Sequence, residues 1–137
     1  MLIAKRKKNR DSIVNSLSNI GNSYQHLDQP EKALAYYLEG YELSKQAKDT
    51  INLSIDELLL GNIYRILKRP KEAFDHLYVS LRLSEQVGNE INKMHAYRFL
   101  AELYKEQKEY AKGQKLAKNS LEAVSYTHLT LPTICSV

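Results

Sequence analysis

The sequence predicts an all-α fold, an α-solenoid of antiparallel helix pairs, and three observations support this prediction. Only three Pro and five Gly occur in 137 residues, whereas Leu, Ala, Lys, Glu, Gln and Asn are abundant, and this composition favours helices. Apolar residues recur three and four positions apart, as on one face of a helix. A shift of the sequence against itself by 40 residues superimposes three copies of one pattern, which is typical of stacked helical repeats.

Each copy contains two amphipathic segments, and the residues between them set the helix boundaries. Pro30 and Pro70 suit the first turn of a second helix, where the missing N–H of proline costs nothing. Asp49-Thr50 and Gly88-Asn89 supply residues that end one helix and cap the next. The predicted helices cover residues 12–27, 30–47, 52–67, 70–87, 92–107 and 109–123, grouped into repeats at 12–50, 51–90 and 91–123.

Small and aromatic residues recur at fixed places in the three copies. Each copy has a small residue in its first helix, a tyrosine three positions later and a second small residue nine positions after that. This pattern resembles the tetratricopeptide repeat over nearly the whole chain. The resemblance implies a superhelix in which the small residues lie where two helices cross. These positions are Gly21, Tyr24 and Ala33, then Gly61, Tyr64 and Ala73, then Ala101, Tyr104 and Gly113.

Two features depart from the commonest version of this repeat. Glu57 occupies a position that is usually large and apolar, and the period is 40 residues where the commonest version has about 34. The longer period is similar to repeats of kinesin light chains, G-protein-signalling modulators, and the sensory regions of many bacterial histidine kinases and transcription regulators. We expect longer helices and an unchanged arrangement of the binding surface.

The resemblance also implies a binding surface, because the first helices of successive repeats line a concave groove that takes a protein or peptide ligand. Amides such as Asn22 and its equivalent Asn62 can both donate and accept hydrogen bonds along an extended peptide, and the cationic side chains can bind carboxylates. The two-carboxylate clamp of chaperone-binding members is not reproduced. The predicted groove residues are Asn22, Gln25, Asn62, Arg65, Arg98, Glu102 and Lys105, with Asn15, Ser18, Leu58 and His95 on the same face.

The sequence carries no recognisable catalytic arrangement. It contains no glycine-rich phosphate loop, no His-Glu-x-x-His and no Gly-x-Ser-x-Gly. His26, His76 and His95 lie in different predicted helices without a cysteine companion, and we interpret them as surface or groove residues. We therefore expect a non-catalytic chain without a metal or cofactor.

The net charge of +4 is concentrated in the run Lys5 to Arg10. Such a run raises the alternative of nucleic-acid binding, but the rest of the chain mixes both charge signs, so we interpret it as the solvated end of a helix. Three functions remain open at this point: a peptide-binding scaffold or regulatory module, the sensory region of a bacterial signalling protein, and weak nucleic-acid binding. No apolar run reaches the roughly 18 residues that a membrane span needs.

Both ends of the sequence interrupt the repeat. The 40-residue register places Met1 to Lys8 on Tyr41 to Lys48, so residues 1–11 are expected to be the end of a preceding repeat. Residues 124–133 resemble a translated transposon-end adapter of sequencing libraries, and we interpret residues 124–137 as a non-native tail. On this interpretation, Cys135 has no function and the natural gene continues into further domains.

Overall fold

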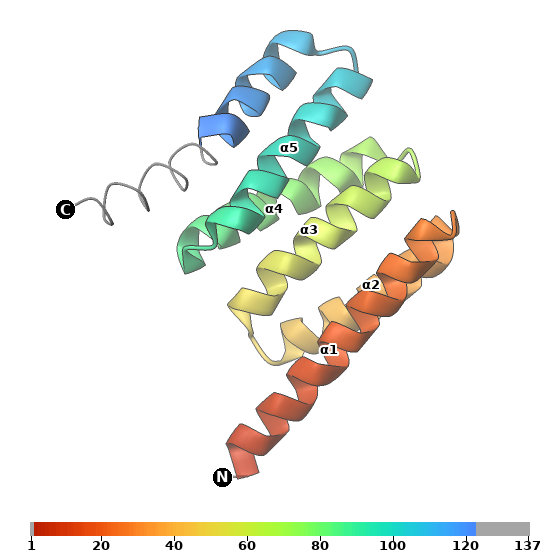
Figure 1. The fold of residues 1–137 in the computed structure, drawn as a ribbon, viewed down its shortest axis with the longest axis vertical. Helices are drawn as coiled ribbons and strands as arrows, with labels where there is room; N and C mark the ends of the chain where they lie inside the picture. Colours follow the sequence, from red (N-terminus) through yellow and green to blue (C-terminus); the bar gives the residue numbers. More distant parts are fainter. Residues whose placement is uncertain (1, 123–137) are drawn as a thin grey trace, which may run out of the picture.

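A computed structural model describes residues 2–122, and this part of the chain forms six helices in antiparallel pairs (Figure 1). The labelled helices are α1 (Leu2–His26), α2 (Pro30–Gln46), α3 (Thr50–Ile66), α4 (Pro70–Val87) and α5 (Glu90–Glu106), and residues 110–122 form the partner of α5. The all-α solenoid predicted from the sequence is confirmed. The interpretation of residues 124–137 as a non-native tail concerns residues outside the described ones.

The helix starts follow the local chemistry of the chain. Proline occupies the first turn of α2 and of α4. The side chain of Asp49 caps α3 by accepting a 3.1 Å hydrogen bond from the backbone N–H of Asn52, and Asn89 caps α5 in the same way at 3.0 Å from Asn92 N. Each cap satisfies one of the N–H groups that the first helical turn leaves without a backbone partner.

The first helix begins earlier than predicted: α1 starts at Leu2, whereas the predicted start was near residue 12. No proline or glycine occurs between Leu2 and Ile20, so nothing in the sequence breaks the helix within this span. The basic run is part of α1, and the side chains from Lys5 to Lys8 are exposed. The assignment of residues 1–11 to a preceding repeat stays a prediction.

The helices form two layers. α1 contacts α3 and α3 contacts α5, whereas α2 and α4 each contact only the neighbouring first helices among the labelled elements. Figure 1 shows α1, α3 and α5 side by side, with α2 and α4 behind them. Closer spacing in the first layer than in the second curves the array, so that α1, α3 and α5 lie on its concave side.

The two helices of a pair cross at glycine. A β-carbon added to Gly21 would lie 2.5 Å from Cε1 of Tyr37, and one added to Gly61 would meet Leu77. Tyr37 and Leu77 are themselves buried, at 2% and 0% exposed. The large side chain of the second helix therefore occupies the place that a side chain on the first helix would take.

Glu57 is buried at its unusual position with 5% of its surface exposed. Its Oε2 accepts a 2.5 Å hydrogen bond from Nδ1 of His76 on α4, and the His76 ring stacks on Tyr64 with centroids 5.3 Å apart. His76 keeps 24% of its side chain exposed and supplies the hydrogen-bond partner that the buried Glu57 carboxylate needs.

A second buried polar cluster joins α3, α4 and α5. The Asn92 amide nitrogen donates to the backbone oxygen of Ser54 at 3.0 Å, to Ser84 Oγ at 2.5 Å and to Ser80 Oγ at 3.2 Å. Ser80 Oγ also donates to the backbone oxygen of Ser54 at 2.8 Å. Since all four residues are at most 5% exposed, these hydrogen bonds replace those with water that burial removes.

Candidate functional site

Arg65 lies in the last turn of α3, the middle one of the three helices on the concave side, and links two repeats. Its Nη1 is 2.6 Å from Oε1 of Glu106 at the end of α5. Its Nε and Nη2 donate to Oδ1 of Asn62, one turn earlier on α3, at 3.3 and 3.0 Å. The guanidinium is thus fixed between α3 and α5 while 20% of the side chain stays exposed. A fixed, partly exposed guanidinium suits recognition of a planar anion.

The half-buried ring of Phe99 is flanked by two guanidinium groups. The Cζ atom of Arg65 lies 5.9 Å from the ring centroid and that of Arg98 lies 5.0 Å from it. Nη2 of Arg98 is 3.2 Å from Nδ1 of His95. Burial, reinforced by the Arg98 charge, lowers the pKa of His95, so this imidazole stays neutral and can accept the hydrogen bond at neutral pH. The Phe99 ring is thus flanked by Arg98 and by the Arg65 guanidinium, which is paired with Glu106.

The predicted groove residues of the first repeat are engaged within the molecule. The Tyr37 hydroxyl lies 2.5 Å from Oδ1 of Asn22 and 3.1 Å from Oε1 of Gln25. Burial raises the pKa of Tyr37 to about 12, so its hydroxyl keeps its proton at neutral pH. Both amides keep part of their surface exposed. They orient the tyrosine hydroxyl, and part of each side chain remains accessible to solvent.

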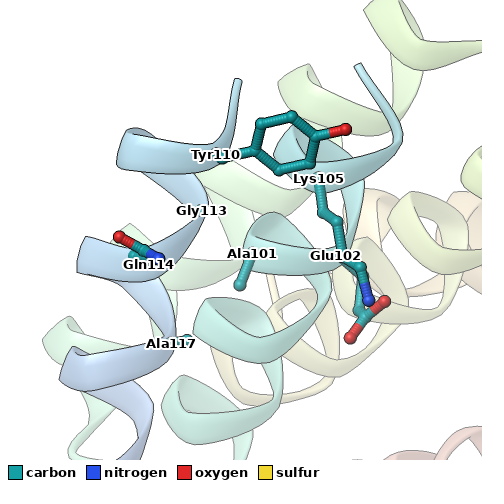
Figure 2. A pocket seen from close by; sticks show the side chains of 7 residues that line it. All are labelled: Ala101, Glu102, Lys105, Tyr110, Gly113, Gln114 and Ala117. Atoms are coloured by element: carbon teal, nitrogen blue, oxygen red, sulfur yellow. The ribbon is translucent and has the colours of Figure 1, made fainter. Parts of the chain in front are cut away.

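Glu102 and Lys105 lie at the edge of a pocket between α5 and the 110–122 helix (Figure 2). The pocket has a volume of about 280 Å³, and its lining surface is mainly apolar. Ala101 points into it from α5, while Tyr110 stands at one end. The lining residues are Ala101, Glu102, Lys105, Tyr110, Gly113, Gln114 and Ala117.

Two further hollows lie on the described surface. One of about 230 Å³ lies beside the Arg65–Glu106 ion pair and is mainly polar. The other, of about 400 Å³, lies between α1 and α2, where the rings of Tyr24 and Tyr36 stack 5.4 Å apart. Within residues 2–122, no three His, Cys, Asp or Glu side chains gather in a way that could hold a metal ion. Over the same stretch, every helix is too short or too polar to cross a bilayer.

A family model of the tetratricopeptide repeat matches residues 12–86, more than half of the chain. The chain belongs to the tetratricopeptide repeat family. Tetratricopeptide repeats are generally protein-binding modules, and no catalytic family matches. The resemblance identified from the small and aromatic positions is therefore confirmed.

Among solved structures, the tetratricopeptide repeat domain of Arabidopsis FLU is similar to this chain. The two share 20% sequence identity with a TM-score of 0.78, over 85% of this chain and 98% of that one. At this identity the similarity concerns the fold. No curated protein sequence matches the chain.

Six of the seven predicted groove residues of this tetratricopeptide repeat array fall into three pairs, and the seventh, Arg98, lies beside the Phe99 ring. Asn62 and Arg65 meet around one guanidinium, Asn22 and Gln25 meet around the Tyr37 hydroxyl, and Glu102 and Lys105 share a pocket. The sequence interpretation missed Phe99 and Glu106, since nothing in the pattern indicates which side chains meet between repeats. It also missed the pocket, although the 40-residue register gives a signal for it: the three equivalent positions hold Tyr37, Leu77 and the much smaller Ala117.

Proposed function

We propose that this tetratricopeptide repeat array is a non-catalytic module that binds an extended acidic peptide segment along α1, α3 and α5. The observation that carries the proposal is the arrangement around Arg65. Glu106 and Asn62 hold its guanidinium in place, and the Phe99 ring with Arg98 beside it offers an apolar contact next to a second positive charge. A carboxylate and a neighbouring apolar side chain of a peptide fit this combination.

The module is proposed to act as a scaffold or as a regulatory input. The resemblance of its 40-residue period to sensory regions of bacterial signalling proteins favours the second role. On that proposal the natural protein carries an output domain in cis, and the sequence of the full-length gene tests it directly. A gene that encodes further repeats and no output domain favours the scaffold.

Selection of short peptides from a random displayed library tests the binding proposal. We expect enriched sequences to pair acidic with apolar residues, and their affinity to fall as the salt concentration rises. The double variant Asn62→Ala with Arg65→Ala should bind the enriched peptides at least about tenfold more weakly, since charge-assisted hydrogen bonds contribute roughly 1.5–3 kcal/mol each. The array should remain folded, because Arg65 and Glu106 are both partly exposed.

A matched control is Arg82→Ala, which removes one exposed arginine from α4 in the second layer. It changes the net charge by the same amount and leaves the concave face intact. Equal loss of affinity in both variants would indicate a general charge effect. Unchanged affinity in the double variant would exclude this part of the concave face as the binding surface.

A further inference from the structure

The pocket between α5 and the 110–122 helix lies at a place where the other two helix pairs have a large side chain. Ala117 is equivalent by register to Tyr37 and Leu77. Tyr37 packs against Gly21 in the first pair, and Leu77 packs against Gly61 in the second. In the third pair Ala101 faces Ala117 across the pocket, and Ala117 is smaller than Tyr37 or Leu77 (Figure 2). The third pair therefore lacks the side chain that closes the first two.

The polar edge of the pocket is also equivalent to known contacts of the first pair. The Tyr37 hydroxyl there bonds to the side chains of Asn22 and Gln25. Glu102 and Lys105 occupy the equivalent positions in the third copy, and both line the pocket. A carboxylate accepts a hydrogen bond and an ammonium group donates one, whereas a phenol hydroxyl does both. The edge is thus complementary to a phenol.

The size of the pocket suits an aromatic ring. A dry cavity of about 150 Å³ in another protein holds a benzene molecule, and this pocket of about 280 Å³ is larger. Tyr110, which is 59% exposed, stands at one end and offers its ring for an aromatic contact.

We propose that this pocket binds a tyrosine side chain of the peptide partner. The ring takes the place that Tyr37 fills in the first pair, and the hydroxyl lies between Glu102 and Lys105. This inference rests on the proposed function, since it names one residue of the peptide that the concave face binds.

The proposal is tested with p-cresol, the isolated side chain of tyrosine, titrated into the full chain while backbone amide resonances are followed by NMR. We expect saturable shifts at Ala101, Gly113 and Ala117, with toluene binding at least severalfold more weakly. No shift at these amides, or equal affinity for toluene, would overturn the assignment.

Two substitutions on the same helix give a matched comparison. Ala117→Leu, which copies Leu77, should abolish the p-cresol shifts and raise the melting temperature, because it fills the pocket from within. Ala111→Leu adds the same side chain at an exposed position that does not line the pocket and should leave binding unchanged. Undiminished p-cresol binding by Ala117→Leu would overturn the proposal.

Failure of this inference and failure of the proposed function give different results. The Asn62→Ala, Arg65→Ala variant should bind p-cresol normally, because neither residue lines this pocket. If library peptides bind through Arg65 but Ala117→Leu does not weaken any of them, the peptide-binding module stands and the tyrosine pocket falls. If p-cresol binds and no peptide does, the pocket recognises a phenol, and the peptide-binding function falls together with the assignment of the pocket to a peptide tyrosine.

Discussion

The Leu77 side chain lies directly over Gly61. A β-carbon added to Gly61 would come within 2.5 Å of Leu77 Cγ and 3.2 Å of the Leu77 backbone nitrogen. Because the backbone nitrogen belongs to α4, a rotation of the leucine side chain cannot remove the whole conflict. The distance between α3 and α4 is thus set by the absence of a side chain at Gly61.

Gly61→Leu should lower the free energy of unfolding by about 1–3 kcal/mol, because it overpacks this crossing. Thermal or urea denaturation measures the effect. Gly61→Ala combined with Leu77→Ala recreates the Ala101 and Ala117 pair of the third copy and should cost less than the sum of the single changes. An unchanged melting temperature in Gly61→Leu would contradict the crossing geometry.

Replacement of Asn92 by Ala should destabilise the array by about 1–3 kcal/mol. The change leaves the Ser80 and Ser84 hydroxyls without the amide contact in a buried site. Denaturation in urea measures the difference. Asn19→Ala on α1 is the control, since this side chain is exposed and its loss should have an effect within about 0.5 kcal/mol.

Asp56 makes the stability depend on pH. It is 2% exposed on α3, and burial raises the pKa of its carboxyl to about 6, while the nearby Ser44 hydroxyl opposes the rise and the Asp49 and Glu57 charges add to it. Within the described residues, Ser44 Oγ and Asp56 Oδ2 do not reach hydrogen-bond geometry with any partner. The Ser44 hydroxyl therefore compensates for burial only in part.

The folded state binds the Asp56 proton more tightly than the unfolded state does, so the contribution of Asp56 to stability is fully present below about pH 4 and is lost as the pH rises through about 6. A rise of about two pKa units corresponds to at most roughly 3 kcal/mol. Asp56→Asn should thus stabilise the protein by about 1–2 kcal/mol at pH 7 and have little effect at pH 4. Denaturation at both pH values tests this, with Asp75→Asn on the exposed face of α4 as the control.

Lys68→Gly should raise stability by about 1 kcal/mol. Lys68 closes the turn between α3 and α4 with a φ of 60°, and Asp28 and Lys108 do the same at equivalent positions. Residues with a β-carbon adopt this left-handed conformation at a cost of roughly 1–2 kcal/mol, partly offset by the greater freedom of glycine in the unfolded chain. Lys71→Gly, inside α4, should instead destabilise by about the same amount. If both substitutions changed the free energy of unfolding in the same direction, the prediction would be contradicted.

The repeat pattern predicted the helices well because each boundary depends on local residues such as Pro30, Pro70 and Asp49. It failed for the start of α1, where the register placed a boundary but the local residues continue a helix. The family model covers the first two copies, whereas the third has Ala101, Gly113 and Ala117 in place of the commoner residues.

The candidate site was predictable in part. The resemblance to the tetratricopeptide repeat, combined with the 40-residue register, predicted Asn62 and Arg65 on the concave face, because residues of one helix share a face at fixed intervals. The contacts of Arg65 with Glu106 and Phe99 depend on the packing geometry of α3 against α5. A sequence pattern does not contain this geometry. The hydrogen bond between Glu57 and His76 on α4 could not be predicted for the same reason, because it depends on how α3 and α4 pack. Ligand contact stays a prediction for all seven groove residues: Asn22, Gln25, Asn62, Arg65, Arg98, Glu102 and Lys105.

Of the two buried hydroxyls that Asn92 contacts, only that of Ser84 has a counterpart one repeat earlier, in Ser44. Asn52, the equivalent asparagine, donates to Asp11 and Asp49 at 3.1 and 2.9 Å. The positions that match Ser54 and Ser80 hold Val14 and Gly40. Exchange or duplication of these helix pairs would place an asparagine against Val14 and Gly40, with the Ser44 hydroxyl as the one remaining equivalent of the Ser80 and Ser84 hydroxyls. Each interface between helix pairs thus has its own set of polar residues. The helix pairs of this array are therefore not interchangeable, although they share one repeat pattern.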